Sequence, residues 1–478
     1  MLRSSEGVSM HKSVNTELSR DVCETNSKEA VATAVQVSEA ATLSSAANDA
    51  RQVVIVGGGA GGLELAVKLA RRYKRRKDID VVLIDKNPTH IWKPLLHEVA
   101  TGSMNSYHDE ASYRLLAKKH GFRFLLGRVE RIDTEAKRIM LSSVHDVDGQ
   151  EMMPGRIVVY DKLTVSVGSQ SNDYNIPGVS THARQLDSRE QAEVFHKEFT
   201  LQLHRVNARQ DVNSVLSVVI IGGGATGVEL AADMHNVVQR LKEYGFEQLS
   251  RERLVVSIIE AAPGLLPRLP DRIGASVQRE LARIGVNVQV GTRVSKITQT
   301  AVMTSDGDEI PSDISVWAAG VKAPSWLGDC GFPVDRLGRI EVNSDLSVKD
   351  LPGVYAIGDC CACYTDDGVE VPPRAQAAHQ MATIAAHNIR AEVDSGRKKD
   401  FVYRDFGSLV SLSKFSTIGN LMGNLVRGTV FIEGWIARLV YLSLYRLHQR
   451  AIHGTLSMFL IMLGDRIYRA TRAAVKLH

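Results

Sequence analysis

The 478-residue sequence lacks a long apolar run and carries almost no excess of charge. The best apolar stretch near its C-terminus, Leu456 to Leu463, is far shorter than the roughly 18 residues that a membrane-spanning helix needs. Because 58 Lys and Arg residues nearly balance 54 Asp and Glu residues, the overall charge indicates neither nucleic acid nor a strongly acidic partner. The hydrophobic content of 44% nevertheless predicts a chain that folds around buried cores.

Cysteine is also scarce. Five are present, an odd number, and three of them crowd together at Cys360, Cys361 and Cys363. So few cysteines in a chain of this length do not form the pattern of a disulfide framework. We therefore expect a reducing compartment.

The first fifty residues lack large apolar residues and contain no apolar run long enough for a signal peptide. They are rich in Ser, Ala, Thr and Glu, which is typical of a segment without a core. Acidic residues such as Glu6, Glu17 and Asp21 argue against an organellar transit peptide, which contains few acids. We predict a flexible extension over 1–50, with an upstream start codon chosen by gene prediction as the alternative origin.

The sequence does contain a repeated glycine pattern. A short β-branched run leads into Gly57, and a second such run leads into Gly222. Each turn is followed by apolar residues at helical spacing and then by a strand that ends on an acid, Asp85 in the first copy and Glu260 in the second. Strand, glycine turn, helix and strand form a βαβ unit, so the repeat predicts an α/β fold with two Rossmann-like dinucleotide-binding domains.

In the first copy, Gly57, Gly59 and Gly62 match the GxGxxG pattern. The first glycine permits a tight turn, the second lets the backbone approach a pyrophosphate, and the third allows close packing of helix on strand. The helix N-terminus faces the phosphate charge, and Asp85 is placed to accept hydrogen bonds from a ribose. A purely structural turn is the alternative.

In the second copy, Gly222, Gly224 and Gly227 match the same pattern. A carboxylate at Glu260 would bond the ribose hydroxyls of NADH and repel the extra phosphate of NADPH, so we favour NADH. Arg268 lies close enough in sequence to weaken that preference, and a structural role for Glu260 is the alternative. Two turns require two dinucleotides, and the natural pair is a bound FAD with a diffusing NADH.

Other segments resemble the pyridine-nucleotide-dependent flavoproteins that have two dinucleotide-binding domains. VYAIGD, residues 354–359, looks like their second flavin-contacting motif, whose aspartate, here Asp359, bonds the ribityl chain. VWAAG, residues 316–320, looks like the motif in which the chain returns from the nicotinamide domain to the flavin domain, and it ends on Gly320.

Within that group the sequence resembles the type II NADH:quinone oxidoreductases from about residue 52 to its end. PLLHEVATG, residues 94–102, and PPRAQAAHQMA, residues 372–382, are the most specific segments. The second contains the family's AQxAxQ pattern, whose two glutamines, here Gln376 and Gln380, lie beside the flavin ring and the quinone pocket in that family.

As bare residues, the two glutamines share one helix face and could equally be polar surface positions. His379 lies between them, and we favour a structural role for it; the proton donor to the quinol is not identified. The sequence departs from the family where many members carry a lysine, because Phe406 precedes Gly407 here. A quinone role for a lysine at that place is therefore unsupported.

Cys360 and Cys363 form a CxxC, which in a flavoprotein suggests a redox-active disulfide. The stretches where disulfide reductases carry their pair, here 91–102 and 264–268, contain no cysteine. Sulfide:quinone reductases need cysteines beside the flavin, and Cys330 stands alone in its loop. We favour inert thiols and no metal site, with metal binding and redox sensing as the alternatives.

Near the C-terminus, Trp435, Leu439, Leu442 and Tyr445 recur at helical spacing with basic residues between them. This pattern suits a helix that lies in the headgroup region of an anionic membrane. Packing on the protein's own core, or on a second copy in a homodimer, is the alternative. Since a quinone lives in the bilayer, we expect peripheral attachment to the cytoplasmic face of the bacterial inner membrane.

The predicted organisation is an extension over 1–50, an FAD-binding domain over 51–170 and 313–390, an NADH-binding domain over 171–312, and a membrane-associating helical region over 391–478. The candidate FAD-binding residues are Gly57, Gly59, Gly61, Gly62, Asp85, Gly320, Asp359 and Gln376. The candidate NADH-binding residues are Gly222, Gly224, Gly227, Glu229 and Glu260, and the candidate catalytic residues are Gln376 and Gln380.

The resemblance implies transfer of hydride from NADH to FAD and of two electrons to a membrane quinone, without proton pumping. One alternative is a soluble NAD(P)H reductase for a protein electron carrier, in which the basic C-terminus would be a docking surface. Another is a flavin-based sensor that binds NADH without sustained turnover.

Overall fold

The computed structural model describes residues 50–105, 110–146, 148–208, 214–412, 416–421, 430–433, 435–471 and 476. Apart from Ala50, the extension predicted over 1–50 lies outside the described residues. The described chain divides into two compact units, a small one of residues 127–160 and a large one that contains the remainder.

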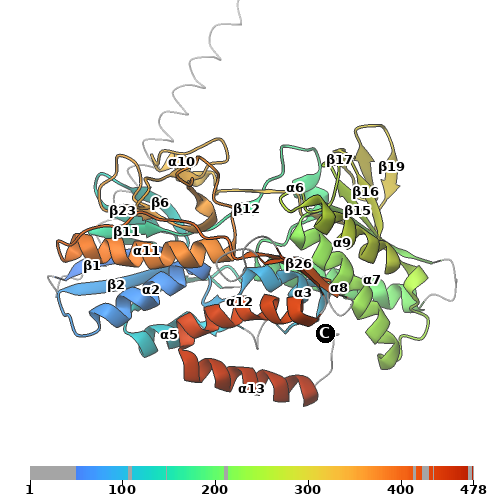
Figure 1. Cartoon of the computed structure of the whole chain (residues 1–478), viewed down its shortest axis with the longest axis horizontal. Helices are drawn as coiled ribbons and strands as arrows, with labels where there is room; N and C mark the ends of the chain where they lie inside the picture. The colour runs from blue at the N-terminus through green and yellow to red at the C-terminus, as the bar shows by residue number, and fades with distance from the viewer. Residues whose placement is uncertain are drawn as a thin grey trace, which may run out of the picture. The chain divides into compact units, whose positions relative to one another are not determined.

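The large unit contains a five-stranded parallel sheet that carries the first glycine turn (Figure 1). Its order is β23, β11, β1, β2, β5, and every neighbouring pair is parallel. The strands are β1 (Arg51–Val56), β2 (Ile79–Asp85), β5 (Arg123–Leu126), β11 (Lys162–Val165) and β23 (Val354–Ala356). Both faces of such a sheet are covered, so β1 is buried from Gln52 to Val56 without alternation. Helices α2 (Ala60–Tyr73) and α11 (Ala375–Val393) pack side by side.

A second five-stranded parallel sheet, in the order β13, β20, β14, β15, β16, carries the second glycine turn. Its strands are β13 (Ala183–Arg184), β14 (Leu216–Ile221), β15 (Leu254–Glu260), β16 (Asn287–Val290) and β20 (Ile314–Trp317). Strand β20 pairs with β14 and so belongs to the second sheet. The chain returns to the first sheet at β23, which pairs with β11. Two parallel sheets with the same strand, turn and helix confirm the predicted α/β class with two Rossmann-like domains.

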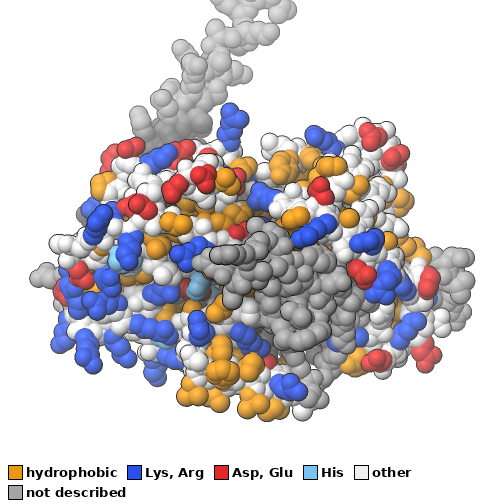
Figure 2. Space-filling view, in the orientation of Figure 1, with side chains coloured by type: hydrophobic (Ala, Val, Ile, Leu, Met, Phe, Trp, Pro, Cys, Tyr) orange, Lys and Arg blue, Asp and Glu red, His pale blue; other side chains and the backbone are white. Residues whose placement is uncertain are grey.

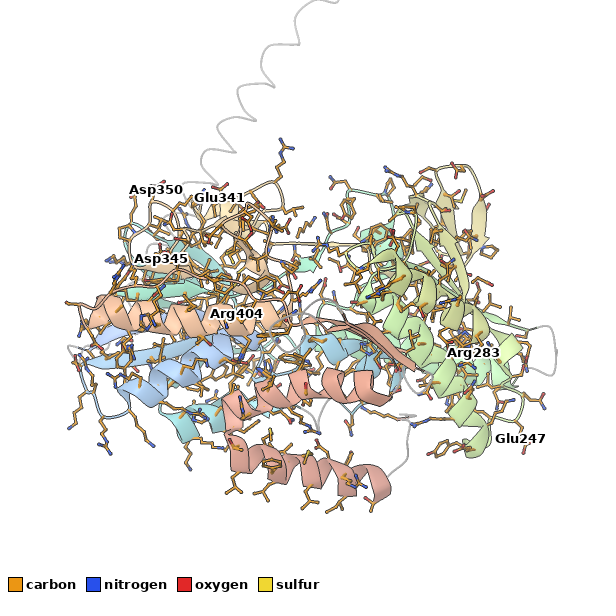
Figure 3. All side chains as sticks on the ribbon, in the orientation of Figure 1. Glu247, Arg283, Glu341, Asp345, Asp350 and Arg404 are labelled. Carbon is orange, nitrogen blue, oxygen red and sulfur yellow. The ribbon has the colours of Figure 1, made fainter. Side chains whose placement is uncertain are left out.

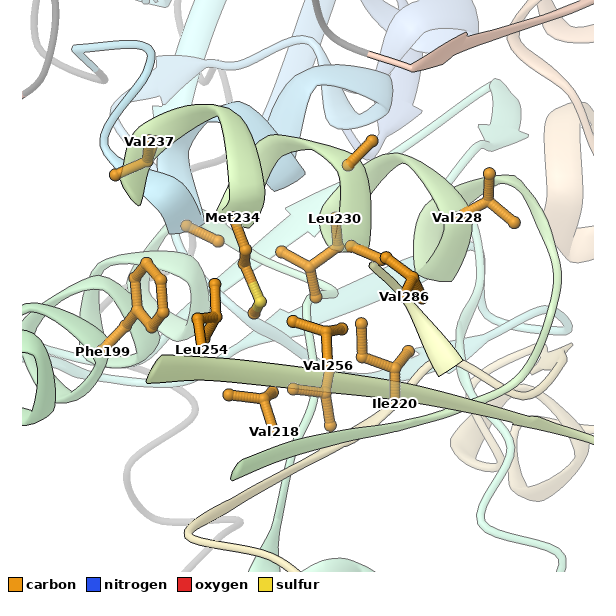
Figure 4. Close-up of a cluster of buried hydrophobic side chains, with 14 of the residues drawn as sticks. Phe199, Val218, Ile220, Val228, Leu230, Met234, Val237, Leu254, Val256 and Val286 are labelled. Carbon is orange, nitrogen blue, oxygen red and sulfur yellow. The ribbon is translucent and has the colours of Figure 1, made fainter. Parts of the chain in front are cut away.

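The second sheet packs against α8 (Ala225–Leu241) through a core of branched side chains (Figure 4). Val228, Leu230 and Met234 of the helix are fully buried, as their spacing predicts, and they share this core with Val218 and Val256 of the strands. The core holds the helix close to the sheet, so the N-terminus of α8 stays beside the ends of β14 and β15.

The large unit also contains further helices and strands. The remaining helices before residue 400 are α3 (Leu96–Thr101), α5 (Tyr113–His120), α6 (Val179–His182), α7 (Arg189–Ala208), α9 (Asp271–Arg283), α10 (Trp326–Asp329) and the 3-10 turns η1 (Lys93–Leu95), η2 (Lys242–Tyr244), η3 (Arg251–Arg253) and η4 (Gly358–Cys360). The strand pairs are β3 (Thr89–His90) with β4 (Ala111–Ser112), β12 (Gln170–Ser171) with β21 (Val321–Lys322), and β22 (Ile340–Glu341) with β24 (Cys361–Ala362). Strands β17 (Val294–Ile297), β18 (Ala301–Thr304) and β19 (Glu309–Pro311) form an antiparallel sheet.

The small unit is built from antiparallel strands. Strands β6 (Val129–Asp133), β7 (Arg138–Leu141) and β10 (Arg156–Val159) form a sheet in the order β10, β7, β6, and β8 (Val144–His145) pairs with β9 (Glu151–Met153).

The C-terminal region, predicted to be helical, begins with an antiparallel sheet. The sheet consists of β25 (Gly407–Leu412), β26 (Ser416–Leu421) and β27 (Val430–Glu433). Two helices follow, α12 (Trp435–His453) and α13 (Thr455–Thr471). Helix α12 buries His448 and Ile452, whereas α13 leaves large apolar side chains exposed. Among the described residues, no helix has both the length and the apolar character that crossing a membrane requires.

Candidate functional site

The first glycine turn has the shape that a dinucleotide requires. Gly57 has φ +97°, and a Cβ there would lie 2.5 Å from the carbonyl oxygen of Ser166. A Cβ on Gly62 would lie 1.9 Å from the carbonyl oxygen of Gly57, so the helix and the turn meet too closely for a side chain. At Gly59, the N-cap of α2, a Cβ would meet nothing within 4 Å. The backbone is therefore open where a pyrophosphate would approach the helix N-terminus.

The second turn repeats this geometry. Gly222 has φ +113°, and a Cβ there would lie 2.6 Å from the carbonyl oxygen of Ala318. A Cβ on Gly227 would lie 2.2 Å from the carbonyl oxygen of Gly222, whereas one on Gly224, the N-cap of α8, would meet nothing within 4 Å. Two independent segments thus form the same cradle for phosphate.

The two strand-end acids also occupy equivalent places. Asp85 accepts a hydrogen bond from the Gly58 backbone N–H at 2.6 Å, and Glu260 accepts one from the Gly223 backbone N–H at 2.6 Å. Burial raises the pKa of Asp85, against the opposing hydrogen bonds from the backbone. Each carboxylate is therefore fixed to the middle of its own glycine turn, beside the place where a ribose follows the phosphates.

Three further candidate FAD-binding residues lie outside the GxGxxG glycines, and each has a defined contact. A Cβ on Gly61 would lie 3.2 Å from the carbonyl oxygen of Ala378, so this glycine lets α2 pack against α11. Asp359, in η4, accepts a hydrogen bond from Ser169 Oγ at 2.9 Å. Gly320 has φ +73° and accepts a hydrogen bond from the Asn172 backbone at 3.2 Å. The contacts of Gly61, Asp359 and Gly320 with FAD stay predictions.

Both glutamines of α11 bind the segment 404–407. Gln376 donates to Asp405 Oδ1 and to the Gly407 carbonyl, each at 3.1 Å, and accepts from the Phe406 backbone N–H at 3.2 Å. Gln380 donates to the Arg404 carbonyl at 2.8 Å and accepts from the Arg404 backbone N–H at 3.0 Å; Figure 3 labels Arg404 beside α11. The amide groups hold this segment on the helix, and their predicted place beside flavin and quinone stays a prediction.

Glu229, in the first part of α8, is buried against α3 and β25. Its carboxylate accepts a hydrogen bond from the Ser411 backbone N–H at 3.0 Å and lies 3.6 Å from His97 Nδ1. The other nitrogen of His97 lies 3.5 Å from Asp233. Burial raises the pKa of Glu229 well above its usual value, and the Asp233 charge adds to the rise. This buried cluster joins α8 to α3 and β25, and a direct contact of Glu229 with NADH stays a prediction.

A second buried cluster was not predicted. It is the histidine–glutamate chain of His379, Glu64, His448 and His90. Glu64 of α2 contacts His379 Nδ1 at 2.5 Å with one carboxylate oxygen and His448 Nδ1 at 2.8 Å with the other. His448 Nε2 lies 3.0 Å from His90 Nε2, and His90 Nδ1 lies 2.9 Å from the Gly58 carbonyl oxygen. The chain ends at the first glycine turn.

The hydrogen-bond partners determine where the protons of this chain lie. His90 Nδ1 faces a carbonyl oxygen, so it donates; burial lowers the pKa of His90 to about 3, so the ring is neutral and its Nε2 accepts. Burial raises the pKa of Glu64, but hydrogen bonds from His379 and His448 outweigh it and hold the carboxyl ionised. His448 lies between the Glu64 carboxylate and the His90 ring, with one buried ring nitrogen facing each of them.

The clustered cysteines are buried free thiols. Burial raises the pKa of Cys360 to about 12 and that of Cys363 to about 11, so both stay protonated at neutral pH and are poor nucleophiles. Within the described part of the chain, no group of three or more His, Cys, Asp or Glu side chains has an arrangement that could hold a metal ion.

The sequence model of the pyridine nucleotide-disulphide oxidoreductase family matches residues 51–382. A type II NADH:quinone oxidoreductase from Haemophilus influenzae is 40% identical over 443 residues, which cover 90% of this chain and 100% of that protein. The type II NADH:quinone oxidoreductase NdhA from Mycobacterium tuberculosis is 30% identical over 430 residues, covering 84% and 86% respectively.

The fold agrees with these matches. The structure of NDH2 from Plasmodium falciparum in complex with NADH has a TM-score of 0.74 at 19% identity and covers 89% of this chain and 100% of that chain. The resemblance drawn from the glycine turns and the glutamine motif is confirmed. The chain belongs to the pyridine nucleotide-disulphide oxidoreductases and, within them, to the type II NADH:quinone oxidoreductase family.

Proposed function

We propose that the protein oxidises NADH, with FAD held at the first glycine turn, and passes two electrons to a membrane quinone without pumping protons. The observation that carries this proposal is the pair of equivalent turns, each with an open backbone at its middle glycine, Gly59 or Gly224. When bound, FAD supplies the chemistry that accepts a hydride from NADH and returns electrons to a quinone.

The chain's own residues bind and orient the two dinucleotides in this proposal. The backbone N–H groups at the N-termini of α2 and α8 receive the two pyrophosphates. Asp85 and Glu260 bond ribose hydroxyls, and the charge of Glu260 favours NADH over NADPH. Asp359, oriented by Ser169, bonds the ribityl chain. Gln376 and Gln380 hold the segment 404–407 on α11, the helix that lies beside the flavin and the quinone in this proposal.

We propose peripheral attachment to the cytoplasmic face of the bacterial inner membrane through α13. The support is a stripe of exposed apolar side chains at helical spacing, formed by Leu456, Phe459, Leu460, Leu463 and Ile467. A second copy of the chain that covers this stripe in a homodimer is the alternative. Light scattering of the purified protein without lipid separates the two, because a dimer that buries the stripe would form in solution.

The redox proposal is tested by following flavin absorbance without oxygen. Addition of NADH to the flavin-loaded protein should bleach the flavin, and addition of a short-chain quinone should restore its absorbance within turnover time. NADPH should reduce the flavin more slowly than NADH. A reduced flavin that persists in the presence of quinone would overturn the proposal in favour of an NADH-binding sensor.

Steady-state turnover distinguishes a soluble reductase from a quinone reductase. If a protein carrier such as a ferredoxin accelerates NADH oxidation and a short-chain quinone does not, the proposal that a quinone is the electron acceptor is wrong. The expected result is acceleration by the quinone.

A further inference from the structure

A group of exposed cations lies at one end of the large unit, outside the dinucleotide sites. The C-terminal end of α2 and the chain just after it contribute five cations, and α5 contributes three more. These residues, which we call the α2–α5 cations, are Arg71, Arg72, Lys74, Arg75, Lys77, Arg114, Lys118 and Lys119, and each of them is exposed. Figure 2 shows Lys and Arg side chains gathered over this part of the molecule.

The α2–α5 cations are not neutralised by neighbouring acids. The acids nearest in sequence, Asp78 and Asp80, are paired with other arginines, since Asp78 contacts Arg51 and Arg76 and Asp80 contacts Arg123. Within the described residues, none of the eight forms an ion pair with a carboxylate. Eight cations on one surface therefore leave a strong local positive field, although the net charge of the whole chain is only +4.

This positive surface adjoins the apolar stripe of α13. Lys119 donates hydrogen bonds to the His453 carbonyl at 2.8 Å and to Ser457 Oγ at 3.2 Å, where α13 begins. His120 contacts the Ile452 carbonyl at 2.6 Å and also accepts a hydrogen bond from Arg71 at 3.3 Å, so α2, α5 and the start of α13 are tied together. In Figure 2 the hydrophobic side chains of α13 lie beside the basic ones.

We propose that the α2–α5 cations bind the headgroups of anionic phospholipids while the apolar stripe of α13 enters the membrane boundary. Apolar surface alone binds any bilayer, whereas a cluster of cations beside it selects an anionic one. The second contact comes from the flavin-binding domain itself, so it fixes the rotation of the enzyme about α13 and keeps the flavin domain against the membrane. This proposal rests on the membrane attachment given above and adds its lipid class and its second point of contact.

The test compares binding of the full-length flavin-loaded protein to phosphatidylcholine vesicles and to vesicles that also contain phosphatidylglycerol, by sedimentation. The patch variant carries Arg72→Glu, Arg75→Glu and Lys118→Glu. Each cation near an anionic surface strengthens binding by about fivefold, and each glutamate adds repulsion, so we expect the patch variant to bind the anionic vesicles at least about 100-fold more weakly than the parent. Binding to phosphatidylcholine should stay unchanged, and added salt should remove the difference.

The matched control carries the same charge change at exposed cations outside α2, α5 and α13, Arg293→Glu, Lys296→Glu and Arg336→Glu. It should bind both kinds of vesicle as the parent does. If the patch variant binds anionic vesicles as tightly as the parent, or if the control loses as much affinity, the proposal is wrong. Tighter binding of the parent to duplex DNA than to anionic vesicles would assign the α2–α5 cations to nucleic acid instead.

Turnover with a short-chain quinone keeps the two proposals apart. Both variants should oxidise NADH with a soluble quinone at the parent rate, because none of the changed residues belongs to the dinucleotide sites. If the parent does not turn over with the quinone, the proposed function is wrong. If the patch variant keeps both the turnover and the lipid binding of the parent, only the proposed lipid contact is wrong. If the parent sediments with neither kind of vesicle, the membrane attachment and the lipid contact are both wrong.

Discussion

At the scale of single residues, a substitution at Gly224 can affect ligand binding without affecting the fold. A methyl group at Gly224 meets no protein atom within 4 Å, so it should not disturb the folded chain. It would lie where the backbone is expected to approach a pyrophosphate. We predict that Gly224→Ala leaves the urea unfolding curve and the flavin content unchanged and raises the KM for NADH by at least about tenfold.

Gly59→Ala is the matched control, since Gly59 has the same open geometry in the first turn. It should lower flavin content and leave NADH binding to the second domain intact. If both variants change the same property, the assignment of one dinucleotide to each turn is wrong.

The neutral, buried ring of His90 predicts a loss of stability in acid. Its pKa is about 3 in the folded chain, so between pH 6.5 and 3 the unfolded chain binds a proton that the folded chain does not. Stability therefore falls as the pH drops below 6.5, and by pH 5 this group alone contributes a loss of about 2 kcal/mol. Burial is the largest cause of this lowered pKa, and His448 and His453 lower it further, against the opposing effects of the Gly58 carbonyl and Glu64.

A His90→Gln variant cannot titrate in this range. Urea unfolding at pH 7.5 and pH 5 should show a smaller acid loss in the variant than in the parent, by about 2 kcal/mol. Equal losses would mean that His90 is not neutral in the folded protein.

Prediction at this scale succeeded where the chemistry is local. Gly57, Gly62 and their counterparts are recognised from spacing alone, because the turn that needs them is contained in six residues. The partners of Glu64 could not be recognised in this way, since His379 and His448 lie 315 and 384 positions away. An acid inside an otherwise apolar helix face was the available signal, and it indicates burial without naming the partner.

At the scale of elements, the two βαβ units were predictable and their surroundings were not. The helices α2 and α8 follow from apolar spacing within one window of sequence. The place of β20 in the second sheet, and the antiparallel sheet of β25 to β27 within a region predicted to be helical, depend on pairing with distant strands. Such pairing is decided by tertiary contacts that a local pattern does not encode.

The position of α12 relative to α2 depends on the buried Glu64–His448 pair. Glu64 is 1% exposed and His448 2% exposed, so water cannot replace either partner if the other is removed. We predict that Glu64→Gln, which removes the buried carboxylate that His379 and His448 share, lowers the free energy of unfolding by about 3 kcal/mol, measured by urea titration. The double variant Glu64→Gln with His448→Gln removes both partners and should recover part of that loss.

A double variant that is destabilised by the sum of the two single changes would show that the side chains do not interact. His453→Gln is a suitable control, because His453 is on the same helix and contacts neither Glu64 nor His90 through a hydrogen bond within the described residues.

At the scale of the whole molecule, the two C-terminal helices have different tasks. Helix α12 completes the buried histidine–glutamate chain that ends at the first glycine turn, and the ring of its Tyr445 lies 6.0 Å from that of Trp92. The side chains of Trp435, Leu439 and Leu442, predicted to face a membrane, lie outside those that the structure describes. The exposed apolar stripe belongs to α13, whose Leu456 is 76% exposed. Of the region predicted to bind the membrane, the last helix is therefore the part for which we propose that contact.

Two truncations separate these tasks. A chain that ends at Gly454 keeps α12 and loses α13, so it should retain flavin and turnover with a short-chain quinone. It should no longer sediment with phosphatidylcholine vesicles, because the apolar stripe is gone. A chain that ends at Glu433 also loses His448, one of the two histidines that hold the buried Glu64 carboxylate, and it should fail to retain flavin.

The truncated chain that ends at Gly454 also tests the role of the α2–α5 cations. These residues remain in that chain, so weak binding to phosphatidylglycerol vesicles should persist at low salt and disappear at high salt. Sedimentation with phosphatidylcholine after removal of α13 would show that another surface enters the membrane. The apolar stripe of α13 would then be available to a second copy of the chain. Light scattering would show whether the full-length protein is a dimer and the chain without α13 a monomer.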